Sequence, residues 1–275
     1  MAATLAPPEK GGQAPSASVA FPASARNARP ARRPATMASM QRAPVQALTE
    51  RLAAVRAEIA GAARRAGREA EAVAVVVVTK SAPPAVFAAA REAGVTDVGE
   101  NRVQAALTRM AGHEAHFRWH FVGRLQANKV RKAVAAFDVF HGIDDVALAR
   151  RVDRVAGELG RSPELLLQVN VSGEGAKQGL APAELPRALE ALGTLTHARL
   201  VGLMTMAPYG DDPEAARPVF AALRTLRDAC APQGALPHLS MGMSGDFVPA
   251  VEEGATLVRL GSRLVDDLPD LVAKP

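Results

Sequence analysis

Apolar residues follow two alternating periods along the chain from residue 44 onward. The first stretch has apolar residues at the spacing of one helix face: Val45, Leu48, Leu52, Val55 and Ile59. This spacing predicts a first helix that ends at about residue 66. Residues 73–78 then form a continuous run of Val and Ala, which is typical of a strand buried on both faces, as the strands of parallel sheets are.

The same alternation continues to the end of the chain. Strands are predicted at residues 73–78, 95–99, 118–122, 137–141, 165–171, 198–204, 239–241 and 257–260, with a helix between each pair. Strict alternation requires parallel strands joined by right-handed crossovers, in either a closed barrel or an open doubly wound sheet. Eight such units favour the barrel, and no G-x-G-x-x-G motif follows the first strand. We therefore predict an α/β protein with a single (β/α)8 TIM barrel.

Residues 1–43 differ from the rest of the chain, because they are rich in Pro, Ala and Ser and have no apolar period. We predict a disordered extension there, a barrel over residues 44–268 and a short tail over residues 269–275. The extension contains Arg and Ser and little acid, so a transit peptide is one interpretation. The interpretation that we favour is that translation begins at Met37 or Met40.

The net charge of +5 lies in the extension rather than on the fold. Six basic residues and Glu9 alone occupy residues 1–47, and the whole chain has 33 basic and 28 acidic residues, so the remainder is neutral. We therefore expect no nucleic-acid-binding face on the barrel. The single cysteine, Cys230, excludes an intrachain disulfide and a Cys-based zinc site, which fits a cytoplasmic location. No apolar run is long enough to predict a membrane span.

Functional residues of such barrels lie at the carboxyl ends of the strands. Lys80 follows the first strand, and we expect it to point into the barrel mouth, where partial burial would lower its pKa. A neutral amine can form a Schiff base with an aldehyde. From position alone, a lysine that extends to solvent at a strand end is an equal alternative.

The last two strands end in small residues that suit an anion. Ser244 is a candidate N-cap of the helix after strand seven, and Gly261 and Ser262 form a turn with free amides after strand eight. Arg259, near the end of strand eight, is placed to reach a ring nitrogen or a phosphate, or else pairs with a barrel carboxylate. A lysine that condenses with an aldehyde, opposite a phosphate site, describes pyridoxal 5'-phosphate.

These residues stand in strings that resemble the pyridoxal phosphate homeostasis proteins, which are alanine racemase-like barrels. The most specific strings are W-H-F-V-G-R-L-Q-A-N-K at residues 119–129 and M-G-M-S-G-D at residues 241–246, and the match covers roughly residues 45–265. Shorter matches lie at residues 77–80, 98–104, 168–172, 177–180, 202–206 and 258–261. The family's usual Phe-Gly pair after strand eight is replaced here by residues 264–267, which puts the C-terminal helix in doubt.

The resemblance implies how the residues act. It implies Lys80 as the Schiff-base lysine, phosphate contacts from Ser244 and the turn at residues 261–262, and Arg259 near the pyridine nitrogen. It places Asn101 beside the cofactor ring, and we count Met204, at the end of strand six, among the cofactor-binding residues. The implied protein is a monomeric carrier and regulator of vitamin B6 that serves PLP-dependent apoenzymes and has no catalytic residue or metal.

Two enzyme classes remain as alternatives. An amino-acid racemase needs a base on each face of the cofactor, and the only tyrosine, Tyr209, lies in a loop that we interpret as an exposed turn. A sugar-phosphate aldolase would use Lys80 in the same way, without explaining the matching strings. We interpret His120 and His141 as hydrogen-bonded structural residues rather than metal ligands, and we expect Trp119 to face away from His120 into barrel–helix packing.

Overall fold

The computed structural model describes residues 37–173, 178–232 and 234–269, with side chains from residue 42 onward. Eight parallel strands close into a barrel in which each strand pairs with its neighbours in sequence and β8 pairs with β1. The strands are β1 (Ala74–Val78), β2 (Asp97–Glu100), β3 (Arg118–Phe121), β4 (Val139–Ile143), β5 (Glu164–Gln168), β6 (Arg199–Met204), β7 (His238–Met243) and β8 (Leu257–Leu260). The predicted (β/α)8 barrel is confirmed.

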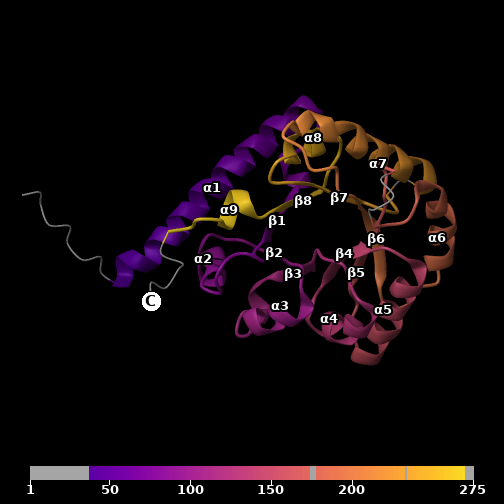
Figure 1. Cartoon of the computed structure of the whole chain (residues 1–275), viewed down its shortest axis with the longest axis horizontal. Helices are drawn as coiled ribbons and strands as arrows, with labels where there is room; N and C mark the ends of the chain where they lie inside the picture. The colour runs from indigo at the N-terminus through magenta and orange to yellow at the C-terminus, as the bar shows by residue number, and fades with distance from the viewer. Residues whose placement is uncertain (1–36, 174–177, 233, 270–275) are drawn as a thin grey trace, which may run out of the picture. The chain divides into compact units, whose positions relative to one another are not determined.

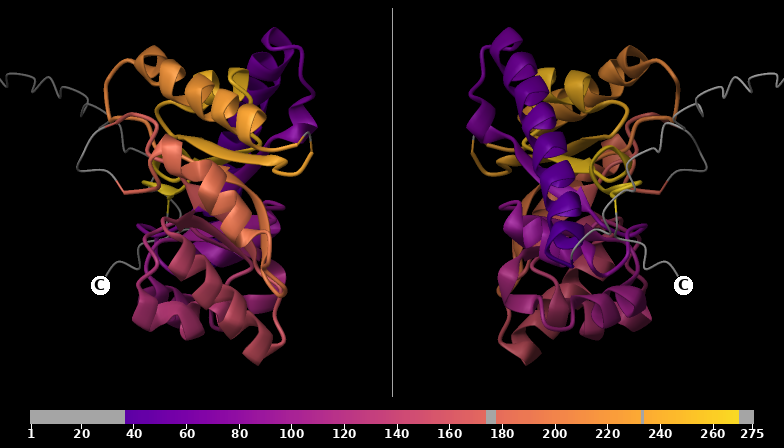
Figure 2. Two further views of the ribbon diagram at one scale, coloured as in Figure 1. Left: turned by 90° about the vertical axis from the view of Figure 1, so that its right-hand side faces the viewer. Right: turned by 90° about the vertical axis from the view of Figure 1, so that its left-hand side faces the viewer.

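Helices surround the strands, as Figures 1 and 2 show. They are α1 (Met37–Arg65), α2 (Val86–Glu92), α3 (Val103–Met110), α4 (Val130–Ala136), α5 (Val146–Leu159), α6 (Leu185–Leu192), α7 (Arg217–Cys230), α8 (Phe247–Glu252) and α9 (Ser262–Val265). Short 3-10 helices occupy residues 70–72, 114–116, 127–129, 182–184 and 213–216. None of the described helices is long and apolar enough to span a membrane.

The strands are buried on both faces, as their apolar sequence predicts. One set of side chains packs outward against the helices, and Trp119 is among them: its ring lies edge-on to Phe87 at 5.4 Å and to Phe117 at 5.5 Å. The prediction that Trp119 faces the helices is confirmed. The other set fills the barrel interior with a small apolar cluster of Val76, Val139, Leu166, Met204 and Leu257.

Helix α1 packs against α2, α8 and α9. Its predicted apolar face is buried, with Leu48, Leu52, Val55 and Ile59 all at most 3% exposed. The helix begins at Met37, earlier than predicted, so residues 37–43 of the predicted extension lie within it. Residues 1–36 and the end of the predicted tail lie outside the described residues.

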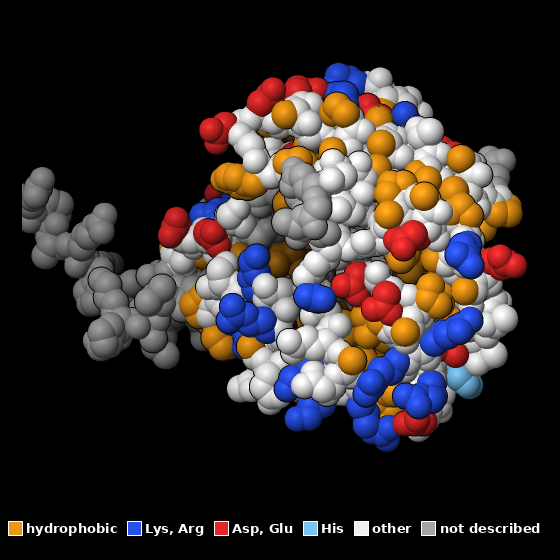
Figure 3. Space-filling model, turned by 45° about the vertical axis from the view of Figure 1, so that its right-hand side comes forward, with side chains coloured by type: hydrophobic (Ala, Val, Ile, Leu, Met, Phe, Trp, Pro, Cys, Tyr) orange, Lys and Arg blue, Asp and Glu red, His pale blue; other side chains and the backbone are white. Residues whose placement is uncertain are grey.

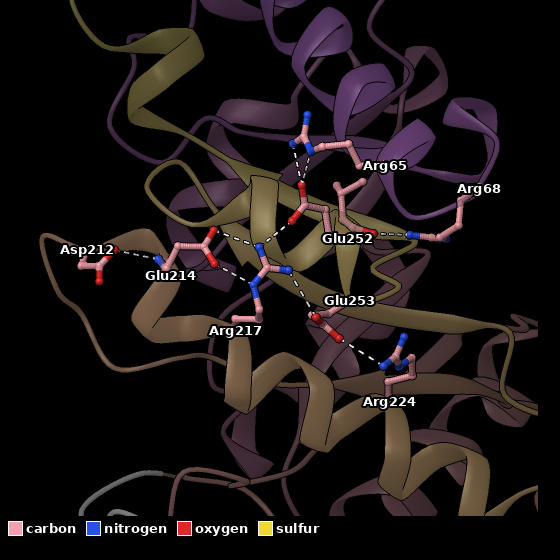
Figure 4. Close-up of polar contacts among 9 residues, drawn as sticks. Arg65, Arg68, Asp212, Glu214, Arg217, Arg224, Glu252 and Glu253 are labelled. Carbon is pink, nitrogen blue, oxygen red and sulfur yellow. Dashed lines mark hydrogen bonds and ion pairs between the residues drawn. The ribbon is translucent and has the colours of Figure 1, made fainter.

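Ion pairs attach the end of α1 to α7 and α8, as Figure 4 shows. Arg65 contacts Glu252, and Arg217 on α7 contacts both Glu252 and Glu253. Glu253 also pairs with Arg224 at 3.2 Å. These pairs lie near the surface, where each contributes little alone, so we assign them to holding the helices in register rather than to a ligand site.

Strands β4 and β5 differ from their predicted bounds for local reasons. Strand β4 begins at Val139 rather than at residue 137, because Phe137 still ends α4 and its N–H donates to the carbonyl of Ala133. Strand β5 ends at Gln168, and beyond it only Val169 forms an isolated bridge, to Leu180. The doubtful C-terminal helix is present as α9, four residues long.

Charged side chains of both signs are interspersed on the surface, as the face in Figure 3 shows. Basic side chains are denser toward one edge of this face, with acidic and apolar side chains among them. This distribution agrees with the equal numbers of acidic and basic residues outside the first 47 positions.

Candidate functional site

The carboxyl ends of β1 and β8 lie side by side. Val77 pairs with Leu260, and a Cβ added at Gly261 would lie 3.3 Å from the carbonyl oxygen of Val78, so a larger residue would crowd the β1 backbone. Beyond these strand ends, the hydroxyl of Ser81 donates to Asp266 at 2.9 Å. The segment that carries Lys80 therefore lies beside the turn after β8. From the sequence we expected the lysine opposite this turn, and the structure corrects that expectation.

Lys80 is exposed, and the prediction that it would be partly buried is wrong. The reason is local: β1 ends at Val78, and Thr79 directly after it is still fully buried. The chain then turns at residues 80–81, which leaves Lys80 exposed. The amine is therefore open to solvent at the barrel mouth. An exposed amine remains accessible to an incoming aldehyde.

A cluster of polar side chains holds the segment on which Lys80 lies. The buried carboxylate of Glu100, at the end of β2, accepts hydrogen bonds from the Thr79 hydroxyl at 2.7 Å and from Arg109 Nε at 3.2 Å. Arg109 also donates to the carbonyl oxygens of Thr79 at 2.8 Å and Ala82 at 2.5 Å. The chain before and after Lys80 is thus fixed by one guanidinium. We call Thr79, Glu100 and Arg109 the Lys80 clamp.

The Lys80 clamp was not predicted from the sequence. Glu100 stood in one of the matching strings, but Arg109 follows from no strand-end rule, because it lies in the last turn of α3. A charged residue on the buried side of that short helix was the only available signal. Its partner is known only once β1, β2 and α3 are placed together.

The β7 end adds polar groups from the neighbouring strand. Gly242 has φ +90°, and a Cβ there would lie 2.6 Å from the Ala250 Cβ, so only glycine fits this turn. The N-cap of α8 is Asp246 rather than Ser244, which corrects the sequence prediction. Asp246 accepts a hydrogen bond from the Met243 amide at 2.5 Å. Burial raises the pKa of Asp246 above its usual value.

Ser244 does not cap α8, and its side chain contacts the turn after β8 instead. Its hydroxyl oxygen accepts hydrogen bonds from the amide of Gly261 at 3.3 Å and from the amide of Arg263 at 3.4 Å. The structure thus brings Ser244 together with the turn of Gly261 and Ser262. Main-chain N–H groups and a hydroxyl gathered in this way are the donors that a phosphate uses.

Arg259 is buried under this end of the barrel. Its guanidinium donates to Ser240 Oγ at 2.5 Å and to the Thr205 carbonyl oxygen at 3.1 Å. Burial lowers the pKa of Arg259 to about 10, partly offset by the charge of Asp246. Among the described residues, no carboxylate lies within ion-pair distance of the Arg259 guanidinium. The alternative that Arg259 pairs with a barrel carboxylate therefore finds no partner in that part of the chain. A guanidinium has five N–H donors, so Arg259 has donors to spare.

The remaining candidates lie in different surroundings. Asn101 is half-buried at the end of β2, and its carbonyl oxygen would be 2.3 Å from a Cβ at Gly123, so its backbone is tightly packed. Met204 is 1% exposed within the interior apolar cluster. Contact of either residue with a cofactor stays a prediction. Tyr209 is 97% exposed in its loop, which confirms the interpretation as an exposed turn residue.

Both barrel histidines are fully buried and hydrogen-bonded, as predicted. His120 and His141 contact each other at 2.8 Å. Burial and the neighbouring His120 lower the pKa of His141 well below its usual value, so His141 is neutral. No group of three or more His, Cys, Asp or Glu side chains is arranged to hold a metal ion within the described ranges.

Comparison with known proteins shows the family of the chain. Residues 51–269 match the family described as alanine racemase, N-terminal domain. The pyridoxal phosphate homeostasis protein of Aquifex aeolicus is 40% identical over 218 residues, which are 78% of this chain and 96% of that protein. The Escherichia coli K12 protein of the same name is 36% identical over 231 residues, 79% and 95% of the two chains. The chain belongs to the pyridoxal phosphate homeostasis protein family.

The fold is also similar to that of solved structures, one of which contains bound pyridoxal 5'-phosphate (PLP). PipY of Synechococcus elongatus, solved with PLP bound, has a TM-score of 0.69 and 41% identity, and the match covers 79% of this chain and 99% of PipY. An alanine racemase of Clostridium difficile has a TM-score of 0.61 at 14% identity, and the match covers 80% of this chain and 56% of the racemase. At that identity, the likeness to the racemase is one of fold alone.

Proposed function

We propose that this pyridoxal phosphate homeostasis family member binds pyridoxal 5'-phosphate, holds it as a Schiff base on Lys80 and acts in intracellular vitamin B6 homeostasis without catalysing a reaction. The observation that carries the proposal is the meeting of three groups at one end of the barrel. These are an exposed lysine after β1, anion donors at Ser244 and Gly261 beside it, and a buried arginine with unused donors.

The donor set fits the cofactor chemically. The hydroxyl of Ser244 and the amides of Gly261 and Ser262 would hold the phosphate, in place of the long contacts that Ser244 now accepts. The spare donors of Arg259 would face the pyridine nitrogen. Asn101 would lie beside the ring and Met204 beneath it. The cofactor supplies an aldehyde that bonds reversibly to an amine.

Arg259 also explains why this site suits carriage better than catalysis. A guanidinium is a donor only, so the pyridine nitrogen it faces must be an acceptor and stays unprotonated. An unprotonated ring withdraws electrons poorly, which disfavours carbanion chemistry. Lys80 itself is exposed, so the amine that would hold the cofactor is accessible from solvent.

The proposal extends to location and partners. We propose a cytoplasmic monomer that passes the cofactor to PLP-dependent apoenzymes and binds neither nucleic acid nor membranes. The neutral charge of residues 48–275 supports the part of the proposal that excludes nucleic acid.

The test is a spectroscopic titration of the full chain with pyridoxal 5'-phosphate. Wild type should gain a visible absorption band at a ratio of one cofactor per chain, and Lys80→Ala should not. Lys132→Ala is the matched control, because Lys132 is an exposed lysine on α4, far along the chain from the site, and it should behave as wild type. A wild-type protein without the band would refute the proposal, and formation of D-alanine from L-alanine would favour the racemase instead.

A further inference from the structure

A row of polar side chains, all buried except the partly exposed Asp97, crosses the barrel interior and ends at Arg259. Asp97 Oδ1 lies 2.8 Å from His120 Nε2, and His120 Nδ1 lies 2.8 Å from His141 Nε2. His141 Nδ1 lies 2.7 Å from Ser240 Oγ, which in turn accepts from Arg259 Nη1. These residues come from β2, β3, β4, β7 and β8, and the bond between His141 and Ser240 spans the barrel, because β4 and β7 are not neighbours.

The chemistry of the two ends fixes the direction of every hydrogen bond between them. Arg259 can only donate, so Ser240 Oγ accepts from it, and the Asp97 carboxylate at the other end can only accept. With both histidines neutral, these two ends leave the Ser240 hydroxyl as the donor to His141 Nδ1. A neutral His141 then carries its proton on Nε2 and donates to His120 Nδ1. His120 in turn carries its proton on Nε2 and donates to Asp97. Each donor in the row therefore has one acceptor.

Asp97 provides the acceptor that the row needs at its far end. Burial acts to raise the pKa of Asp97, but hydrogen bonds from His120 and Thr96 and the charge of Arg118 together bring it below its usual value. The carboxylate is 15% exposed and lines a hollow of about 360 Å³ between α1 and the starts of β1 and β2. The row thus joins the amino-terminal end of the barrel to the end where the cofactor site lies.

We propose that Asp97, His120, His141 and Ser240 form a directional hydrogen-bond relay that orients Arg259 toward the cofactor ring. They are positioning residues of the cofactor site, and Asp97 acts on the site from the opposite end of the barrel. The inference rests on the proposed function, since Arg259 is assigned there to the pyridine nitrogen. The relay keeps the lone pair of Ser240 directed at Arg259, which fixes the plane of the guanidinium and the direction of its remaining donors.

The relay makes two substitutions informative. Ser240→Ala removes the acceptor of Arg259 and the donor to His141 Nδ1 in one step, so we expect the dissociation constant for pyridoxal 5'-phosphate to rise about tenfold. Asp97→Asn keeps the shape and one carbonyl acceptor but removes the charge, and we expect a rise of about threefold. Asp138→Asn is the matched control, because Asp138 accepts from the Trp119 amide near the same end of the barrel but is outside the relay.

The first readout needs no cofactor. In the full chain labelled with ¹⁵N-histidine, long-range ¹H–¹⁵N spectra should show His120 and His141 neutral, each with its proton on Nε2, assigned through His120→Gln and His141→Gln. Ser240→Ala should change the His141 signals, and Asp97→Asn those of His120, whereas Asp138→Asn should change neither. A histidinium or an Nδ1–H tautomer at either position in wild type overturns the relay.

The second readout is the spectroscopic titration with pyridoxal 5'-phosphate for the same variants, each first checked for a thermal melting midpoint close to that of wild type. Weaker binding by Ser240→Ala and Asp97→Asn, with unchanged binding by Asp138→Asn, is the expected result. If wild type binds and the relay variants bind equally well, the relay is overturned while the proposed function stands. If wild type does not bind at all, the proposed function fails, and so does the assignment of Arg259 to the ring.

Discussion

Removing Arg109 tests whether the Lys80 clamp holds the loop that carries the lysine. Arg109→Ala deletes the bonds from the guanidinium to Glu100, Thr79 and Ala82, and it leaves the Glu100 carboxylate, with a side chain only 2% exposed, facing the Thr79 hydroxyl alone. Breaking a buried ion pair by removing one partner costs 3–5 kcal/mol. Arg109 itself is 16% exposed, so we expect a loss at the lower end, about 3 kcal/mol of unfolding free energy.

Equilibrium unfolding in urea measures this loss. With a denaturant dependence of about 3 kcal/mol/M, the midpoint should fall by about 1 M. Arg131→Ala is the control, because Arg131 pairs with Glu158 at the surface with side chains 62% and 46% exposed, and its loss should cost less than about 0.5 kcal/mol. Adding Glu100→Gln to Arg109→Ala should restore part of the stability, because a neutral amide needs no counter-charge.

The same variant also reports on the site. With its clamp removed, the segment of Lys80 should be held less firmly, and binding of pyridoxal 5'-phosphate should weaken several-fold. The reasoning is refuted if Arg109→Ala is as mild as Arg131→Ala in urea, or if Glu100→Gln makes the double variant worse than the single one.

Three further outcomes follow from single positions. Gly242→Ala should cost more than about 2 kcal/mol in urea unfolding, because φ is +90° and the new Cβ would meet Ala250 at 2.6 Å, and a cost below about 0.5 kcal/mol would contradict this. Asp145→Ala should cost about 1 kcal/mol, because Asp145 caps α5 by accepting from the Leu148 amide at 2.7 Å, and a melting midpoint equal to wild type would count against it. Burial keeps His141 neutral in the folded protein, whereas an unfolded histidine takes up a proton below about pH 6.5, so stability should fall as the pH drops from about 6.5, and less so in His141→Gln.

The sequence predicts the barrel well because its evidence is local. The period of the apolar residues sets each helix and strand, and the strict alternation leaves few topologies. The α1 face from Leu48 to Ile59 and the outward direction of Trp119 followed from these periods alone. Helix ends were less accurate, because the apolar period that predicts α1 begins only at Val45, whereas the helix begins at Met37.

The site was predicted as a set of strand ends but not as a set of contacts. Lys80, Ser244 and Gly261 are brought to the same end of the barrel, yet the exposure of Lys80 and the contact of Ser244 with Gly261 depend on how two loops turn. The row from Asp97 to Arg259 needs side chains from strands far apart, since His141 and Ser240 are 99 residues apart in the chain. No short-range pattern carries such information.

The most direct test of the account is to locate the bond between the protein and its cofactor. The full chain would be loaded with pyridoxal 5'-phosphate, reduced with borohydride and digested, and the masses of the peptides measured. We predict that the added pyridoxyl-phosphate mass lies on Lys80 alone, at about one per chain. Label found chiefly on another lysine, such as Lys129 or Lys132, would contradict the central claim.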